Sequence, residues 1–133
     1  MTMRALVIDD SRAMRRIVGS ILKDLGFDVR EAGDGRQALD ALAAGSAEGW
    51  VPDLCCIDWN MPVMDGLQFV SAVRSTPGYR QVTLMMVTTE SETGQIVKAL
   101  AAGAHEYLIK PFTADALRDK LAMLGLLPEG LPA

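Results

Sequence analysis

Five short apolar segments recur along the chain, and a stretch with helical spacing of apolar residues follows each of them. Continuous apolar runs such as residues 5–8 and 54–57 are typical of parallel strands that are buried on both faces of a sheet. The run 28–32 mixes Val29 with charged residues and predicts a half-exposed edge strand. The predicted strands span residues 5–8, 28–32, 54–57, 82–87 and 107–109.

The stretches between and after these strands predict helices, because their apolar residues recur every three or four positions. The third and fourth helices are expected over residues 66–75 and 91–102, and a loop over 46–52. The candidate N-caps are Ser11, Asp34 and Thr113. The candidate stop signals are Gly26, Gly45 and Gly103. The residues predicted to face the core are Met14, Ile17, Val18, Ile21, Leu22, Leu25, Ala38, Leu39, Leu42, Leu67, Val70, Val73, Ile96, Val97, Leu100, Leu117, Leu121 and Leu124.

This alternation predicts an α/β fold in which a strand and a helix are repeated five times, a (βα)5 arrangement. Short connections between successive elements imply a doubly wound, parallel five-stranded sheet with right-handed crossovers and helices on both faces. We expect one domain over residues 1–125. The remainder, 126–133, is rich in Gly and Pro and predicts a short C-terminal tail.

Composition narrows the class of protein. The net charge is −4. The nearest approach to a basic cluster is formed by Arg12, Arg15 and Arg16, which we expect to lie on a solvated helix face. No nucleic-acid partner is therefore predicted. The apolar runs are too short to span a membrane, and no signal peptide is predicted. Cys55 and Cys56 are adjacent on a strand and should point to opposite faces, which favours a reduced, cytoplasmic protein.

Polar residues follow four of the five predicted strands directly. Because the carboxyl ends of parallel strands meet at one edge of a sheet, where ligand sites of open α/β folds lie, we expect these side chains to converge. In chain order they are Asp9, Asp10, Asp58, Thr88, Thr89 and Lys110.

Three carboxylates in one place repel each other unless a cation joins them, and an all-oxygen set suits Mg²⁺. A zinc site is not expected, because His105 is the only histidine and the cysteines fall inside a strand. A carboxylate such as Asp58 beside Mg²⁺ and Lys110 is a credible nucleophile toward phosphorus. A hydroxyl such as that of Thr88 could donate to a phosphoryl oxygen.

The motifs at these strand ends resemble those of the receiver domain of two-component response regulators. They are Asp9-Asp10, Asp58-Trp59-Asn60-Met61-Pro62 with Asp65-Gly66, Thr88-Thr89-Glu90, Tyr107 and Lys110-Pro111-Phe112. The likeness extends from Met3 to about Leu124, and the run 58–66 is similar to that of CheY-type chemotaxis regulators. It implies a flavodoxin-like sheet with strand order 2-1-3-4-5 and a cis bond before Pro111.

The resemblance also implies a role for each site residue. Asp58 would be the phosphoacceptor. Asp10, Asp58 and the backbone carbonyl of Asn60 would bind Mg²⁺ directly, and Asp9 would act through water. Lys110 would contact the phosphoryl group, and Thr88 and Tyr107 would form the switch. Asn60 and Glu90 flank the expected route of an attacking water, and they are the candidates for tuning the phosphoryl lifetime.

By the same resemblance, the chain is expected to be a single-domain regulator that takes its phosphoryl group from a sensor histidine kinase. It would catalyse only its own phosphorylation and dephosphorylation. Its output would go to a protein target such as the flagellar motor switch or another relay protein, and a phosphatase is a possible further partner. The surface that changes would be formed by the fourth helix, fifth strand and fifth helix. Residues expected on or near it are Thr93, Ile96, Lys98, Tyr107 and Phe112.

Other interpretations stay open from the sequence. A phosphatase of the haloacid dehalogenase type also uses an Asp nucleophile with Mg²⁺, but that family separates its two Asp by one residue, whereas Asp9 and Asp10 are adjacent. A phosphorelay intermediate outside chemotaxis is another alternative. A receiver-like binding module that works without phosphorylation is a third, although such a chain should lack a site residue. Single features also have ordinary explanations: adjacent Asp residues often form turns, and His105 is expected to be a plain surface residue.

Overall fold

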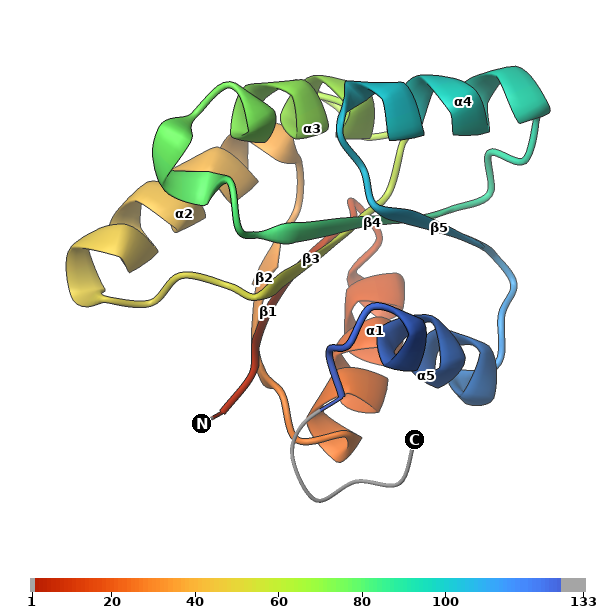
Figure 1. The fold of residues 1–133 in the computed structure, drawn as a ribbon, viewed down its shortest axis with the longest axis horizontal. Coiled ribbons are helices and arrows are strands. Elements are labelled where there is room, and N and C mark those ends of the chain that lie inside the picture. Colours follow the sequence, from red (N-terminus) through yellow and green to blue (C-terminus); the bar gives the residue numbers. More distant parts are fainter. Residues whose placement is uncertain (1, 128–133) are drawn as a thin grey trace.

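Five strands and five α-helices alternate along the chain in the computed structural model, which describes residues 2–127 (Figure 1). The strands are β1 (Arg4–Ile8), β2 (Asp28–Ala32), β3 (Leu54–Ile57), β4 (Thr83–Thr88) and β5 (Glu106–Ile109). The helices are α1 (Arg12–Asp24), α2 (Gly35–Glu48), α3 (Gly66–Arg74), α4 (Thr93–Ala102) and α5 (Ala114–Met123), with a 3₁₀ turn η1 (Pro77–Tyr79) before β4. The expected tail, 126–133, lies outside the described residues from 128 onward.

The strands form one parallel sheet in the order β2-β1-β3-β4-β5, which confirms the predicted fold class and strand order. Strand β2 therefore lies on one side of β1, and β3 lies on the other side of β1. The carboxyl ends of β1 and β3 adjoin at the point where the strand order reverses. Loops that leave two neighbouring parallel strands in opposite directions leave room between them for a ligand site.

The helices cover both faces of the sheet. Figure 1 shows α2, α3 and α4 on one face and α1 and α5 on the other. The buried residues form two matching clusters: Phe69 and Val70 of α3 lie in one, and Leu22 of α1 and Leu117 of α5 lie in the other. Cys55 belongs to the first cluster and Cys56 to the second, so the two free thiols are on opposite faces, as predicted. The alternation of side chains along β3 thus separates them.

The predicted N-caps are confirmed. The side chains of Ser11, Asp34 and Thr113 accept hydrogen bonds from the backbone N–H groups three residues on, at 3.2, 2.8 and 3.0 Å. Each bond satisfies one of the N–H groups that the first helical turn leaves without an intrahelical partner. Because these caps stand two to four residues after β1, β2 and β5, they fix where each helix leaves the sheet edge.

The predicted end of α2 at Gly45 is wrong. The helix continues to Glu48 and ends at Gly49, which adopts the left-handed conformation with φ of 80°. Gly45 is a buried position inside the helix, where an added Cβ would lie 2.5 Å from the backbone oxygen of Trp50. The residue is glycine because the chain returns closely past it, and glycine serves both close approach and left-handed turns.

Three residues predicted to face the core are exposed instead: Ile17 in α1 is 50% exposed, and Val97 and Leu100 in α4 are 58% and 44% exposed. The buried residue of α4 is Ala99, and Ile96 is half-buried. Periodicity defines an apolar stripe, but the width of the stripe that is covered depends on the neighbouring elements. Helix α4 lies above β5 at the edge of the sheet, so it buries only a narrow part of its apolar surface.

His105 is a surface residue, as expected, but it also makes structural contacts. Its side chain is exposed, yet its Nδ1 atom accepts a hydrogen bond from the backbone N–H of Leu84 at 3.1 Å. The guanidinium of Arg74 lies 3.3 Å from the same nitrogen and also donates to the carbonyl oxygens of Gly103 and Val82. This pair ties the end of α3 to the segments that enter β4 and β5. Among residues 2–127, no helix has both the length and the apolar character that crossing a bilayer requires.

Candidate functional site

Three carboxylates meet at the carboxyl edge of the sheet. Asp9 and Asp10 follow β1, and Asp58 follows β3, its neighbour in the sheet. One oxygen of each lies within 4.8 Å of the others, so the three could share a single cation. Asp9 and Asp58 are buried, whereas Asp10 is exposed and has no hydrogen-bond or ion-pair partner among the described residues. The backbone N–H of Asp58 donates to the carbonyl of Ile8 at 2.9 Å, which holds the two loops together.

Lys110, at the end of β5, reaches this cluster from the far side of β4. Its Nζ atom lies 2.6 Å from Oδ2 of Asp9 and 3.8 Å from Oδ1 of Asp58. The resemblance placed Lys110 against a phosphoryl group. The structure shows its shortest contact with Asp9, an ion pair that no spacing in the sequence indicates. The Lys110–Pro111 peptide bond is cis, as expected.

The environment of Asp58 disfavours its charge. Burial raises the pKa of its carboxyl above the ordinary value, and repulsion from Asp9 acts in the same direction. The hydrogen bond from Thr88, the charge of Lys110 and the backbone N–H of Trp59, which lies 2.9 Å from Oδ1, oppose that rise in pKa. A carboxylate held in this way is poorly solvated, and poor solvation makes it a better nucleophile once a cation offsets its neighbours.

Thr88 lies beside Asp58 as the last residue of β4, not in the loop after the strand, and it is fully buried. Its Oγ1 atom accepts long hydrogen bonds from the backbone N–H groups of Trp59 and Glu90, at 3.4 and 3.3 Å. Its hydroxyl proton is therefore available to donate to an oxygen at Asp58.

Tyr107 is buried, with its ring packed in the cluster beneath α2, α3 and α4. Its hydroxyl donates to the carbonyl of Glu90 at 2.6 Å. The Glu90 side chain in turn accepts a hydrogen bond of 2.6 Å from the amide nitrogen of Asn60. Asn60 and Glu90, the candidates for tuning the phosphoryl lifetime, thus contact one another. Tyr107, the candidate switch aromatic, contacts the same loop through the Glu90 carbonyl.

The loop from Asp58 to α3 has little freedom. The N–H of Gly66 donates to the carbonyl of Trp59 at 2.8 Å, and an added Cβ on Gly66 would collide with the backbone oxygen of Asp58. Asp65 stays outside the acidic cluster: it forms a capping box with Gln68 at the start of α3. These bonds explain why Asp65 and Gly66 are required at these positions of the motif. The reason is structural, and neither residue needs a role in the chemistry.

The donor set fits Mg²⁺. Asp9, Asp10 and Asp58 offer oxygen atoms only, and the exposed Asp10 leaves one side of the cluster open to water. Mg²⁺ binds proteins through one or two carboxylates and keeps several waters, so a half-open acidic cluster suits it better than a closed cage. Burial raises the pKa of both thiols, and the sheet holds them inside the core, so Cys55 and Cys56 offer no competing soft ligands.

Sequence reasoning missed Arg15. It is half-buried, not part of a solvated face, and its guanidinium donates to the backbone carbonyl of Asp9 at 2.7 Å. The sequence holds no signal that separates it from Arg12 and Arg16, because the contact depends on the angle at which α1 leaves β1.

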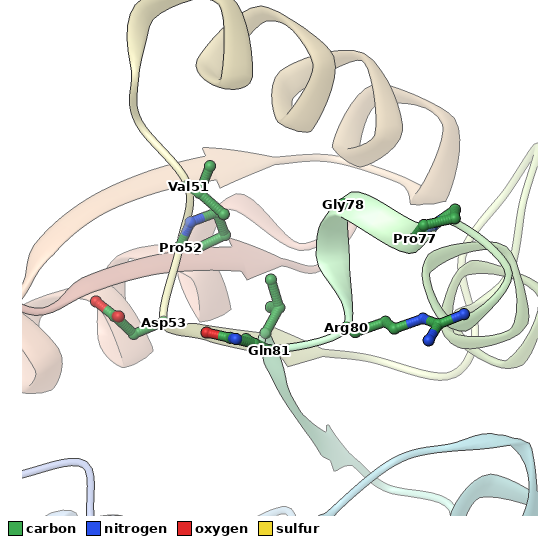
Figure 2. Close-up of a pocket in the computed structure, with 8 residues that line it drawn as sticks. Val51, Pro52, Asp53, Pro77, Gly78, Arg80 and Gln81 are labelled. Atoms are coloured by element: carbon green, nitrogen blue, oxygen red, sulfur yellow. The ribbon is translucent and has the colours of Figure 1, made fainter.

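The described surface also has hollows that the three carboxylates do not line. Figure 2 shows one of about 470 Å³ between the segments that precede β3 and β4, lined by Val51, Pro52, Asp53, Pro77, Gly78, Arg80, Gln81 and Val82. It lies at the amino edge of the sheet, opposite the carboxylates. A second, mainly apolar hollow of about 460 Å³ adjoins Lys110 and is lined by Met14, Ile17, Thr89, Pro111 and Phe112 as well.

A doubly wound sheet of order 2-1-3-4-5 with an acidic cluster, a lysine and a buried threonine at its switch point defines a flavodoxin-like receiver. Residues 5–122 match the model of the response regulator receiver domain. The chain belongs to that family and is a CheY-like receiver domain of a two-component response regulator.

Its relatives include chemotaxis proteins. The chain is 41% identical over 120 residues to chemotaxis protein CheY of Pseudomonas aeruginosa, covering 90% of this chain and 93% of that protein. It is 40% identical over 123 residues to chemotaxis protein CheY1 of Helicobacter pylori, covering 92% and 96%. The structure of chemotaxis response regulator CheY4 of Vibrio cholerae is similar with a TM-score of 0.82 and 35% identity, covering 93% and 99%. These relatives are consistent with a role in chemotaxis.

Proposed function

We propose that this chain is a cytoplasmic phosphoacceptor that takes a phosphoryl group on Asp58 from a phosphohistidine kinase and passes the signal to a protein target. The observation that carries the proposal is the convergence of Asp9, Asp10 and Asp58 within 4.8 Å, with Lys110 3.8 Å from Asp58. These groups come from three separate strand ends, and their convergence offers a nucleophile, a metal site and a fixed cation at one place.

In the proposed transfer, an oxygen of Asp58 forms a bond to phosphorus while the bond from phosphorus to the donor's imidazole nitrogen breaks. That nitrogen keeps the electron pair and takes a proton from solvent. Asp10, Asp58 and the carbonyl of Asn60 would hold Mg²⁺, which when bound would supply positive charge to offset the anionic phosphoryl oxygens. Lys110 and the Thr88 hydroxyl stabilise the same oxygens, and Asp9 orients Lys110.

The proposed switch uses the path from Asp58 through Thr88 to Tyr107. A phosphoryl group on Asp58 brings oxygens that the Thr88 hydroxyl can bind, and movement of Thr88 changes the space around the buried Tyr107 ring. The hydrogen bond from Tyr107 to Glu90 links that ring to the loop before α4. The outward side of α4 and β5 carries exposed Val97, Leu100 and Ile109, an apolar surface suited to a protein target.

The direct test is to incubate the protein with acetyl phosphate and Mg²⁺ and to follow intact mass. We expect one phosphoryl adduct on the wild-type chain, none without metal, and none on Asp58→Asn. The matched control is Asp65→Asn, which alters an acidic residue of the same loop that caps α3 and lies outside the cluster. An adduct that persists in Asp58→Asn would refute the assignment.

Absence of an adduct from the wild-type chain has two explanations that beryllofluoride separates. A stable complex that forms with Mg²⁺ and beryllofluoride would indicate a phosphoryl group that is lost quickly, and the variants Asn60→Ala and Glu90→Ala should then alter its lifetime. Failure to bind beryllofluoride would favour the alternative of a binding module that works without phosphorylation.

A further inference from the structure

Asp9 is held at every polar atom. Its N–H donates to the carbonyl of Ala32 at 3.2 Å, Oδ1 accepts from the N–H of Ser11 at 2.9 Å, and Oδ2 pairs with Lys110. Its backbone carbonyl accepts a hydrogen bond of 2.7 Å from the guanidinium of Arg15. That carbonyl belongs to the peptide unit that joins Asp9 to Asp10, so the Arg15 contact fixes the plane from which Asp10 projects.

The Arg15 guanidinium is itself held from a second direction. Its Nε donates to Oε1 of Glu31 in β2 at 3.1 Å, and the Arg15 side chain is only 18% exposed. One planar group thus joins α1, the end of β1 and the neighbouring strand. An ammonium group on a flexible stem offers no fixed fork with which to hold both acceptors in this geometry.

Asp10 is the carboxylate whose position depends most on these contacts of Arg15. It is exposed, and none of the hydrogen bonds or ion pairs of residues 2–127 involves its carboxylate. Its position relative to Asp58 is therefore set by the backbone, and the Arg15 bond is the side-chain contact that restrains the adjoining peptide. Groups that orient metal ligands without touching the metal commonly change metal affinity by about tenfold or more.

We propose that Arg15 is a positioning residue for the acidic site: through the Asp9 carbonyl it places Asp10 and so raises the affinity for Mg²⁺. This rests on the proposed function, in which the cluster binds Mg²⁺. The effect expected from positioning is opposite in sign to the effect expected from charge alone. Removal of a nearby cation relieves repulsion and should strengthen Mg²⁺ binding, whereas loss of positioning should weaken it, so the two effects have opposite signs.

The test compares Arg15→Lys with Arg16→Lys, and Arg15→Ala with Arg16→Ala. Arg16 is the next residue of the same helix and is exposed, so each pair removes the same charge or the same guanidinium. Mg²⁺ affinity is measured by intrinsic tryptophan fluorescence and by the Mg²⁺-dependent rise of Tm. Urea unfolding without Mg²⁺ reports any purely structural effect.

We expect Arg15→Ala to weaken Mg²⁺ binding about tenfold and Arg15→Lys to weaken it by a smaller factor, with both Arg16 variants at or slightly above wild-type affinity. Equal affinities within either pair, or tighter binding by Arg15→Ala, would overturn the proposal. If Arg15→Ala does not fold, the lysine pair carries the test, since its net charge is unchanged. Failure of the wild-type chain to bind Mg²⁺ would instead overturn the proposed function.

Discussion

The ammonium group of Lys110 lies 2.6 Å from the carboxylate of Asp9, although 101 positions separate the two residues in the chain. Both side chains are nearly buried, at 11% and 6% exposure, so neither charge is well solvated by water. The pair places a fixed cation next to Asp58 before any metal or phosphoryl group arrives. It also neutralises part of a cluster whose three carboxylates would otherwise repel one another.

Removal of the Lys110 ammonium group should make the stability of the fold depend on Mg²⁺. In Lys110→Ala the buried Asp9 loses its partner, and we expect a loss of about 3 kcal/mol in the free energy of unfolding without metal. Mg²⁺ should restore part of that loss by mass action, more than it stabilises the wild-type chain. Urea unfolding with and without Mg²⁺ measures both. Lys120→Ala breaks the more exposed pair with Glu106 and should cost below about 1 kcal/mol. Similar losses in the two variants would contradict this account of Asp9.

The Tyr107 hydroxyl should stabilise the loop before α4. Its bond to the Glu90 carbonyl is 2.6 Å long, and Tyr107→Phe leaves that acceptor without this partner. We expect a loss of about 1 kcal/mol in the free energy of unfolding, measured by urea. Tyr79→Phe is the matched control, because no hydrogen bond of the described residues involves the Tyr79 hydroxyl. If both changes have the same effect, the Glu90 contact does not contribute.

Val63, in the loop after Asp58, has a strained backbone. It is the one residue other than glycine with positive φ among residues 2–127, at 68°, and its side chain is 82% exposed. A β-branched residue is disfavoured there, whereas Asn tolerates the conformation. Val63→Asn should therefore raise the free energy of unfolding by about 1 kcal/mol. Val51→Asn makes the same change at another exposed valine with ordinary φ, and a gain of equal size there would rule out strain as the cause.

His105 should make stability depend on pH. Partial desolvation of the imidazole and the charge of Arg74 lower its pKa below the ordinary 6.5. As pH falls through 6.5, the unfolded chain takes up a proton before the folded chain does, so the free energy of unfolding decreases toward the lower, folded pKa. His105→Gln cannot titrate. Its stability relative to the wild type should rise as pH falls from about 7.5 to about 5.5 in urea unfolding. A constant difference over that range would show that His105 does not contribute.

Much of the fold followed from local pattern. The three predicted N-caps, the half-exposed strand β2 and the opposite facing of Cys55 and Cys56 depend on neighbours within a few residues. The errors have non-local causes. By its place in the sequence Gly45 predicts a helix stop, but it is glycine because Trp50 passes close to it. Val97 and Leu100 match a core stripe, and their exposure reflects where α4 sits over the edge of the sheet.

The sequence by itself determined the order of elements and the strand ends at which polar side chains stand, because apolar runs, periodicity and caps are encoded over a few neighbouring residues. It therefore predicted that Asp9, Asp10, Asp58, Thr88 and Lys110 share one edge. Only the tertiary structure decided which of them touch. The Lys110–Asp9 pair, the Asn60–Glu90 bond and the Arg15–Asp9 contact depend on sheet twist and on the angle at which each helix departs. Those angles result from the packing of all the layers together, and no local segment of the chain contains them.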